Sequence, residues 1–368
     1  MKIFQVINVR WFNATSWYAL TLSRLLADAG HEVTVLTQGN TDTERKAKEL
    51  GLPTVAVDLN TSNPVRLASA TRHIIQLLKK HRPEIVNCHR GEGFFLWALL
   101  KHFGYPYKLV RTRGDQRPPR GDGINRWLHA HVADAVVVTN RRMSDYFLNT
   151  MKTPSKQLWL IHGGVDTKRF AFNGKERARI RDEFQYADDE IVLGLLGRFD
   201  RVKGHRETIE AAALLRKKGL NIKLMLIGFE SATKQKEIQN LIETNGVEDI
   251  TSITGKRDDV EACISAIDIG VLSSLWSEAI ARSALEIMAA DRPLVSTTVG
   301  VMPDLVPESM QVPPGDFHAL ANTIANVIED EKLRENVLAA QKVTMSQLTF
   351  EEFFKRSLSL YKSLVDGD

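Results

Sequence analysis

Short runs rich in β-branched and apolar residues alternate with longer amphipathic stretches along almost the whole chain, and this alternation is the strongest constraint on the fold. The start of the chain shows the pattern. Lys2–Val9 reads as a strand, Ser16–Ala29 carries apolar residues at helical spacing, Gly30 ends that helix, and Glu32–Thr37 reads as the next strand. Strands that alternate with helices are typical of parallel sheets covered by helices. We therefore predict an α/β fold.

Two series of predicted strands indicate two sheets. The first series is Lys2–Val9, Glu32–Thr37, Thr54–Asp58, Glu84–Cys88, Tyr107–Thr112, Ala135–Thr139 and Leu158–Ile161. The second is Ile191–Gly197, Ile222–Gly228, Ile250–Thr254, Ile269–Ser273, Leu294–Thr297 and Met310–Val312. A length of 368 residues also suits two domains. We predict two doubly wound domains that face a central cleft, one over residues 1–165, joined by a C-terminal helix over 350–368, and one over residues 170–345.

Cysteine content and hydropathy exclude several classes of protein. Cys88 and Cys263 lie far apart without a CxxC motif, which argues against a disulfide scaffold or a zinc site and suits the cytosol. No segment reaches the roughly 18 apolar residues of a membrane helix, and Arg10 comes too early for a signal peptide. The single Asp-x-Asp sequence is Asp366-Gly367-Asp368 in the tail. We expect a cytoplasmic protein with no metal site and no cofactor.

The two halves of the chain differ in charge. Residues 1–165 hold 23 Lys and Arg against 12 Asp and Glu, whereas the remainder holds 26 against 33. The basic excess is concentrated between Lys101 and Arg126, where two prolines exclude regular helix or central strand over Arg117–Gly121. An anionic ligand, an anionic membrane surface or a solvated loop would explain it, and Arg66–Arg82 is a second basic stretch. Nucleic acid is not expected, because no recognition module accompanies these cations.

One loop after a predicted strand has the composition of a diphosphate site. Gly197-Arg198 and Lys203-Gly204 follow the first strand of the second series. Ligands of open parallel sheets bind beyond the carboxyl ends of the strands. Two cations flanked by glycines suit a diphosphate there, because each charge-assisted hydrogen bond is strong when shielded from water. The alternative is a solvated loop with no ligand.

Two carboxylates follow a later strand of the same series. Glu278 and Glu286 are eight residues apart, a rise of roughly 12 Å if the segment is helical over Ala279–Ala290. Carboxylate pairs of glycoside hydrolases lie only about 5–9.5 Å apart. The spacing therefore fits two ends of one ligand, such as a nucleoside diphosphate sugar, although Glu286 could also serve only to pair within its helix.

Together these motifs resemble those of the retaining glycosyltransferases of the GT-B fold, family 4, also described as glycosyl transferases group 1. Their pattern is Gly-Arg, then Lys-Gly, then Glu-x7-Glu, and the resemblance covers nearly the whole chain. It implies two Rossmann-like domains, the N-terminal one binding the acceptor and the C-terminal one binding the nucleotide-sugar donor. It also implies transfer with retention of anomeric configuration and without a protein nucleophile.

The resemblance further implies a set of site residues. Arg198 and Lys203 would hold the diphosphate and stabilise its charge, Glu278 would bind the transferred sugar, and these three are the expected catalytic residues. Glu286 would bind the ribose. The other expected donor contacts are Gly197, Lys256, Arg257, Ala279, Ile280 and Ala281. The expected acceptor contacts are Asn13, Ala14, Thr15, His89, Arg113, Arg117 and Arg120. For His89, a purely structural role is the alternative.

The predicted function is that of a hexosyltransferase-type enzyme with a UDP-sugar as first-choice donor and GDP- or ADP-sugars as alternatives. We expect an anionic glycan or glycolipid acceptor, a role in lipopolysaccharide core or another cell-envelope glycan, and a peripheral position on the inner face of the cytoplasmic membrane. Two departures from the family pattern stand out: Arg10–Ser16 replaces a glycine-rich loop, and Arg113 replaces a common histidine. The alternatives are a nucleotide-sugar 2-epimerase and a non-catalytic nucleotide-sugar-binding protein.

Overall fold

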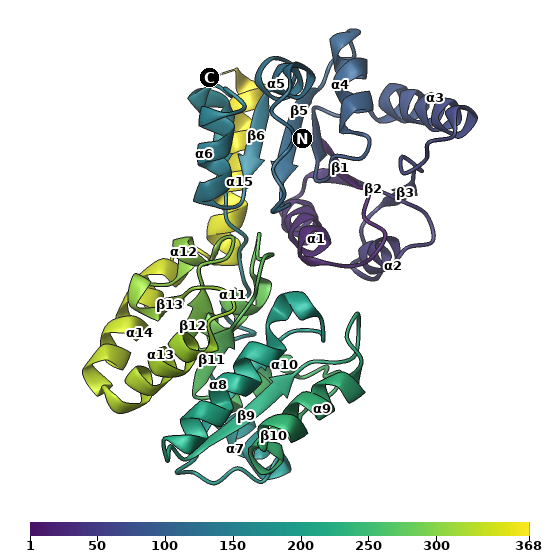
Figure 1. Ribbon diagram of the computed structural model, residues 1–368. Coiled ribbons are helices and arrows are strands. Elements are labelled where there is room, and N and C mark those ends of the chain that lie inside the picture. The colour runs from purple at the N-terminus through teal and green to yellow at the C-terminus, as the bar shows by residue number, and fades with distance from the viewer. Residues whose placement is uncertain (368) are drawn as a thin grey trace. The chain divides into compact units, whose positions relative to one another are not determined.

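The computed structural model describes residues 1–367 and divides into two compact units (Figure 1). Unit 1 contains Met1–Gly164 and the segment from Phe350 onward, and unit 2 contains Val165–Thr349. Each unit is one parallel sheet flanked by helices. The prediction of an α/β chain with two parallel sheets is confirmed.

Unit 1 has a seven-stranded sheet in the order β3-β2-β1-β4-β5-β6-β7. Its strands are β1 (Lys2–Ile7), β2 (Glu32–Thr37), β3 (Thr54–Ala56), β4 (Ile85–Cys88), β5 (Lys108–Arg113), β6 (Ala135–Val138) and β7 (Leu158–Leu160). Its helices are α1 (Ala14–Asp28), α2 (Asp42–Glu49), α3 (Pro64–His81), α4 (Phe94–His102), α5 (Gly123–Trp127), α6 (Arg141–Asn149) and α15 (Phe350–Asp366), with a π-helical turn at Leu128–Val132. Residue 368 of the predicted C-terminal helix, and of the Asp-x-Asp sequence, lies outside the described residues.

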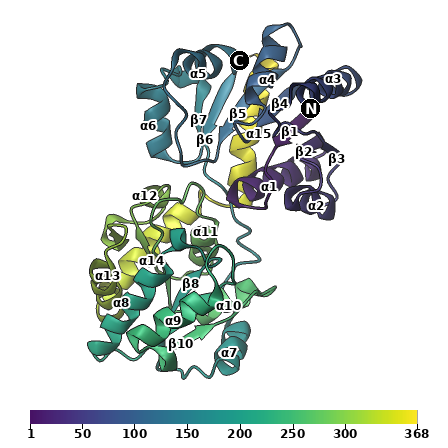
Figure 2. The same cartoon turned by 45° about the vertical axis from the view of Figure 1, so that its right-hand side comes forward.

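The helices of unit 1 cover both faces of its sheet (Figure 2). One core cluster joins the sheet to α3, α4 and α6, and a second joins the other face to α1 and α2. Helix α15 packs beside α1, with the rings of Tyr18 and Phe353 4.7 Å apart between centroids. The buried Tyr361 hydroxyl accepts hydrogen bonds from the Gln5 and Asn87 amides at 3.2 and 2.8 Å. The end of the chain is thereby tied to the centre of the first sheet.

Unit 2 has a six-stranded sheet in the order β10-β9-β8-β11-β12-β13. Its strands are β8 (Ile191–Leu196), β9 (Ile222–Ile227), β10 (Thr251–Ile253), β11 (Ile269–Leu272), β12 (Leu294–Thr297) and β13 (Gln311–Val312). Its helices are α7 (Gly174–Glu183), α8 (His205–Lys217), α9 (Gln235–Asn245), α10 (Val260–Ala266), α11 (Arg282–Ala289), α12 (Met302–Leu305), α13 (Phe317–Glu329) and α14 (Glu331–Met345).

The predicted helix over Ala279–Ala290 begins later than expected. It starts at Arg282, because Ala281 adopts a left-handed backbone with φ +50°. The preceding segment is held outside the helix by a long-range contact, in which the Val301 amide donates to the Glu278 carbonyl at 2.8 Å. The segment between Glu278 and Glu286 is therefore helical only from Arg282 onward, and the separation predicted from a continuous helix is wrong.

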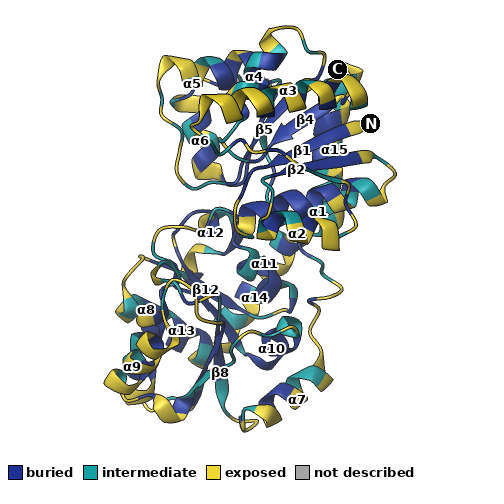
Figure 3. Cartoon of the chain, turned by 90° about the vertical axis from the view of Figure 1, so that its right-hand side faces the viewer, coloured by how far each residue is buried: buried dark blue, intermediate teal, exposed yellow. Residues whose placement is uncertain are grey.

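Burial follows the layers of each unit. The central strands are buried, whereas α3 exposes most of its residues (Figure 3). Over residues 1–367, the structure has no helix that is both long and apolar enough to cross a membrane.

Candidate active site

The strand order of unit 2 reverses between β8 and β11. The connections that follow these two strands run in opposite directions, and ligands of such folds usually bind in the crevice outside the carboxyl edge of the sheet at this point. The loop after β8 contains Arg198 and Lys203, and the loop after β11 contains Glu278. Two motifs that lie 75 residues apart in sequence thus meet at one point of the sheet.

The loop after β8 is shaped by Asp200. One carboxylate oxygen of Asp200 accepts a hydrogen bond from the Val202 amide at 3.1 Å and so caps a short 3₁₀ turn, η3 (Arg201–Lys203). The other oxygen pairs with the Arg198 guanidinium at 3.3 Å. The Arg198 side chain is 45% exposed. Its guanidinium is therefore oriented by Asp200 while it stays accessible to an anion.

Gly204 joins this loop to the loop after β11. Its backbone has φ +72°, and a Cβ atom there would lie 1.9 Å from the Ser273 carbonyl oxygen. The Ser273 hydroxyl donates to the Gly204 carbonyl at 2.8 Å, and the Leu275 amide donates to the Val202 carbonyl at 2.9 Å. Only glycine permits this close approach of the two backbones.

Glu278 lies in the middle of these contacts. Its side chain is 5% exposed, forms an ion pair with the Lys203 ammonium, and accepts a hydrogen bond from the Ser274 hydroxyl at 2.6 Å. Its backbone is fixed by Val301 and by Gly300, where a Cβ atom would lie 2.0 Å from the Glu278 carbonyl oxygen. The crevice therefore presents a fixed carboxylate, which accepts hydrogen bonds from hydroxyls, next to cations that suit phosphate oxygens.

Glu286 projects from α11 and is buried. It accepts a hydrogen bond from Arg282 Nε at 2.6 Å. Burial raises the pKa of the Glu286 carboxyl above its ordinary value, and the Arg282 guanidinium opposes that shift. A buried carboxylate held by one partner retains acceptor capacity for a further donor such as a hydroxyl.

The remaining predicted donor residues lie in loops near these residues in sequence, and they differ in exposure to solvent. Gly197 directly follows β8, Ile280 and Ala281 are buried just before α11, and Ala279 precedes them. Lys256 is exposed, whereas the Arg257 guanidinium is held by Glu183 at 2.5 Å and by Asp259 at 2.8 Å. Any contact of Arg257 with a base would therefore fall to its backbone.

The sheet of unit 1 reverses its order between β1 and β4, and a second cavity lies there. Its volume is about 210 Å³. It is lined by residues that follow β1 and β4, together with one from the loop after β3: Asn8, Val9, Arg10, Trp11, Asn13, Asn60, Arg90 and Glu92. Of the predicted acceptor residues, only Asn13 lines this cavity, and its side chain also caps α1 by accepting from the Ser16 amide at 3.1 Å.

The other predicted acceptor residues are scattered. Ala14 is exposed, and Thr15 is buried with its hydroxyl donating to the Gly114 carbonyl at 3.2 Å. His89 is fully buried, 2.6 Å from the Gln5 side-chain oxygen, and burial lowers its pKa to about 3. This geometry favours the structural alternative for His89. The acceptor role assigned to it stays a prediction.

The basic segment from Lys101 to Arg126 does not form one exposed loop. Arg113 lies at the end of β5, buried, and donates to the Arg117 carbonyl at 2.8 Å. Lys101 is paired with Asp134 at 2.5 Å. Arg117 and Arg120 are exposed. β5 therefore carries part of this charge into the interior, whereas the segment Arg117–Gly121 forms neither helix nor strand, as predicted.

Sequence reasoning assigned no site role to seven of the eight residues that line the unit 1 cavity, namely Asn8, Val9, Arg10, Trp11, Asn60, Arg90 and Glu92. Their common signal is position, since most of them directly follow β1 or β4. That signal becomes visible only when β1 and β4 are known to be neighbours. Over residues 1–367, no three His, Cys, Asp or Glu side chains are grouped so as to hold a metal ion.

The chain matches two family models. Residues 15–169 match Glycosyltransferase Family 4, and residues 176–342 match Glycosyl transferases group 1. Among curated proteins, the 2-deoxystreptamine glucosyltransferase of Streptomyces kanamyceticus is 24% identical over 348 residues, with 84% of this chain and 88% of that protein covered.

Solved structures share the fold. HepE of Anabaena, in complex with UDP, has a TM-score of 0.86 at 19% identity, with 99% of this chain and 100% of that chain covered. The lipopolysaccharide outer core galactosyltransferase WaaB, in its apo form, has a TM-score of 0.75 at 15% identity, with 100% and 99% covered.

Proposed function

Since this chain belongs to the glycosyl transferases of group 1, family 4, and has their GT-B fold, we propose that it transfers a hexose with retention, from a UDP-sugar, to an anionic glycan or glycolipid. That the chain is a glycosyltransferase with a nucleotide-sugar donor follows from the family. The donor base, the acceptor and the residue roles are the proposal. The observation that carries it is the Lys203–Glu278 pair at the strand reversal of unit 2.

The proposed chemistry follows from the charges in this crevice. Cleavage of the bond between sugar and phosphate leaves negative charge on the nucleoside diphosphate. Arg198 and Lys203 stabilise that charge, because cations fixed beforehand cost no reorganisation during the reaction. The acceptor hydroxyl attacks on the face that the diphosphate leaves, and its proton passes to the departing phosphate oxygen.

The two carboxylates position the donor in this scheme. Glu278, oriented by Ser274, accepts hydrogen bonds from hydroxyls of the transferred sugar. Glu286, oriented by Arg282, accepts them from the ribose. The backbone of Gly197 and of residues 279–281 lies next to these side chains in sequence and contributes the close contacts to phosphate and sugar.

We place the reaction in lipopolysaccharide core or other cell-envelope glycan synthesis, on the inner face of the cytoplasmic membrane. The fold likeness to WaaB supports this choice of pathway. An independent support is α3, which contains no Asp or Glu and exposes Arg66, Arg72, Lys79 and Lys80. Near anionic lipid, each such cation contributes about 1 kcal/mol of attraction.

Apolar side chains accompany these cations. Val65 of α3 and Phe103 after α4 are 76% and 75% exposed. A cavity of about 630 Å³ lies between the ends of α3 and α4, lined by Leu78, Lys79, Arg82, Pro83, Phe103, Gly104, Tyr105, Pro106 and Tyr107. Exposed aromatic groups beside cations suit the headgroup region of an anionic bilayer. We therefore assign membrane attachment to this face rather than to Arg117 and Arg120.

A binding screen tests the donor assignment. Calorimetry with UDP, GDP, ADP and their sugar conjugates, with and without magnesium, should show selective binding of UDP compounds. Arg198→Ala should weaken that binding, whereas Lys217→Ala, which removes an exposed cation elsewhere in unit 2, should not. No binding of any nucleotide would contradict the proposal. Inversion at sugar C2 without an acceptor would favour the epimerase, and binding without turnover would favour a non-catalytic binder.

A vesicle experiment tests the membrane assignment. The full chain should sediment with phosphatidylglycerol vesicles but not with phosphatidylcholine vesicles. The double variant Lys79→Glu with Lys80→Glu should lose most of this binding. The matched variant Lys217→Glu with Lys218→Glu makes the same charge change in unit 2 and should keep it. Equal losses in both variants would refute the assignment to α3.

A further inference from the structure

We propose that the cavity at the strand reversal of unit 1 binds an acidic sugar, the phosphate- or carboxylate-bearing residue of the acceptor. This inference rests on the proposed function, because it supplies that reaction with an acceptor class and a place to hold it. It is carried by three features of the cavity: an excess of positive charge, an exposed aromatic platform and a small volume.

Positive charge at this cavity exceeds the carboxylates available to neutralise it. Arg90 lines the cavity and pairs with Glu92 at 2.8 Å and with Asp115 at 2.7 Å. Behind it, Arg111 and Arg113 share the same Asp115 at 3.6 Å each. Three guanidinium groups thus pair with two carboxylates: Asp115 pairs with all three, and Glu92 pairs with Arg90.

Burial increases the cost of this imbalance. Arg111 is 0% exposed, and its Nε and Nη2 atoms have no hydrogen-bond partner. Its Nη1 atom donates to the Cys88 carbonyl at 2.8 Å, which fixes the side chain beneath the end of β4. Burial lowers the pKa of Arg111 to about 9. A buried cation without full compensation is costly, and an anion bound in the neighbouring cavity would offset that cost.

Arg10 adds a fourth cation at the cavity wall. It is exposed, and within residues 1–367 it has no ion-pair or hydrogen-bond partner for its side chain. Its guanidinium is therefore available for a bidentate contact with a phosphate or a carboxylate. With Arg10 included, the charged lining residues and the groups paired behind them comprise four guanidinium groups and two carboxylates. An anionic ligand is favoured over a neutral one.

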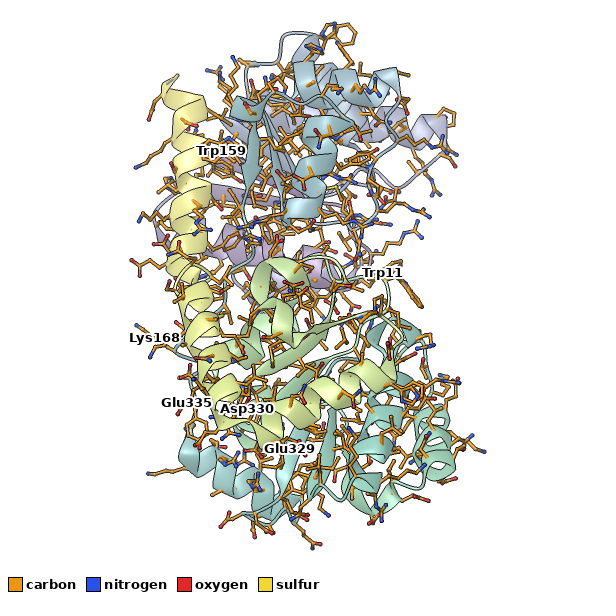
Figure 4. All side chains as sticks on the ribbon, turned by 60° about the vertical axis from the view of Figure 1, so that its left-hand side comes forward. Trp11, Trp159, Lys168, Glu329, Asp330 and Glu335 are labelled. Atoms are coloured by element: carbon orange, nitrogen blue, oxygen red, sulfur yellow. The ribbon has the colours of Figure 1, made fainter. Side chains whose placement is uncertain are left out.

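The remaining lining suits a sugar ring. Trp11 is 58% exposed, and Figure 4 shows its side chain projecting clear of the ribbon of unit 1. The amides of Asn13 and Asn60 lie at the same cavity, and Asn60 donates to Gln38 at 2.6 Å, which leaves its own oxygen to accept. An aromatic face with planar amides beside it matches the apolar face and the hydroxyl edge of a saccharide.

The size of the cavity limits the ligand to one small group. Its volume of about 210 Å³ is below the roughly 300–1,000 Å³ of cavities that enclose drug-sized ligands. A single acidic sugar residue fits these limits, with the rest of the acceptor outside. A hexose phosphate and a hexuronate share the needed chemistry, so the experiment includes both.

The test measures sugar binding without any nucleotide. Calorimetry on the full chain would compare hexose 6-phosphate, hexuronate and neutral methyl hexoside. At least one acidic sugar should bind about tenfold more tightly than the neutral one, a difference of about 1.4 kcal/mol. The tighter of the two acidic sugars identifies the charged group. Equal affinity for the neutral sugar, or no binding by any of the three, would overturn the proposal.

Variants separate the two roles. Arg10→Gln should weaken the acidic sugars about tenfold and leave the neutral one unchanged. Trp11→Ala should weaken all three, and Trp11→Phe should restore part of that loss. Arg142→Gln removes an exposed cation from α6 and serves as the control. Wild-type affinities in both Arg10→Gln and Trp11→Ala would refute the assignment.

Failure of this proposal is distinguishable from failure of the proposed function. Arg198→Ala, which changes only unit 2, should bind the acidic sugar as the wild type does. A wild-type chain that binds acidic sugars but no nucleotide would contradict the donor assignment alone. A chain that binds nucleotide and discriminates no acidic sugar would contradict the acceptor assignment alone.

Discussion

The two ends of α8 allow a controlled test of how the proposed donor site is built. Gly204 precedes this helix and Gly219 follows it, and both have positive φ, +72° and +83°. A Cβ atom at Gly219 would meet nothing within 4 Å, whereas one at Gly204 would lie 1.9 Å from the Ser273 carbonyl oxygen. Alanine at either position adds the same backbone strain, but only alanine at Gly204 separates the loops after β8 and β11.

The expected losses follow from these contacts. Gly219→Ala should cost about 1 kcal/mol in unfolding free energy, the strain of a left-handed alanine. In Gly204→Ala, the new Cβ atom would lie 1.9 Å from the Ser273 carbonyl oxygen, whereas ordinary van der Waals contact begins at 3.4 Å. The loops after β8 and β11 must therefore separate by 1.5 Å. The hydrogen bonds of Ser273 with Gly204 and of Leu275 with Val202 would then be lost, at about 1 kcal/mol each. The total is about 3 kcal/mol.

The same displacement moves Lys203 relative to Glu278. A misplacement of about 1 Å can reduce turnover about 100-fold. Urea unfolding would measure stability, and calorimetry with the selected nucleoside diphosphate, together with donor turnover, would measure the crevice. Gly204→Ala should fail in both assays, and Gly219→Ala should keep nearly full binding and turnover. Equal stability, binding and turnover in the two variants would refute the argument that the close approach of the two backbones at Gly204 aligns Lys203 with Glu278.

Three further predictions concern charge. Lys203→Ala should weaken nucleoside diphosphate binding about 10- to 100-fold in calorimetry, as expected for a charge-assisted contact, and wild-type affinity would contradict its role. Burial raises the pKa of the Glu286 carboxyl. As the pH decreases, nucleotide affinity should therefore begin to fall at a higher pH than it would with an ordinary glutamate. Glu286→Gln should flatten this pH profile, and an unchanged profile in that variant would count against the ribose contact. Burial lowers the pKa of His89, and of His129 in the π-helical turn after α5, to about 3, against 6.5 in the unfolded chain. Below pH 6.5 the unfolded chain takes up protons that the folded chain does not, so stability falls as the pH drops toward 3. Each should lower the unfolding free energy by up to about 1.4 kcal/mol per pH unit in that window, and urea unfolding that does not change between pH 7 and about pH 5 would exclude this.

The strands were predictable from sequence because parallel strands are buried on both faces and read as continuous apolar runs. Ile85–Cys88 and Ile269–Leu272, for example, are buried throughout. Strand order could not be derived in the same way. The neighbouring positions of β1 and β4 depend on how the crossover helices pack, so no local pattern indicated that Arg10 and Arg90 line one cavity.

Long-range backbone contacts explain the other differences. The motif around Glu278 looked helical by composition, yet Gly300 and Val301 hold its carbonyl outside the helix. Arg111 and Arg113 belong to the basic segment whose charge had three open explanations, and both are buried at β5, where carbonyl oxygens of Cys88, Thr112 and Arg117 accept from their guanidinium groups. In each case the decisive partner lies on another strand or loop.

The charges at the two strand reversals imply different demands on their ligands. In unit 2, Glu278 already pairs with Lys203, so the diphosphate of the proposed donor would share that cation with the carboxylate. An ammonium has three N–H donors and can serve both, but a sugar that donates hydroxyls to Glu278 frees more of Lys203 for the phosphate. The proposed donor site would therefore favour an intact nucleotide sugar over the nucleoside diphosphate left after transfer, and this difference would help that product to leave. In unit 1 three guanidinium groups, those of Arg90, Arg111 and Arg113, share the single carboxylate of Asp115, so the proposed binding there depends more on the negative charge of the ligand itself.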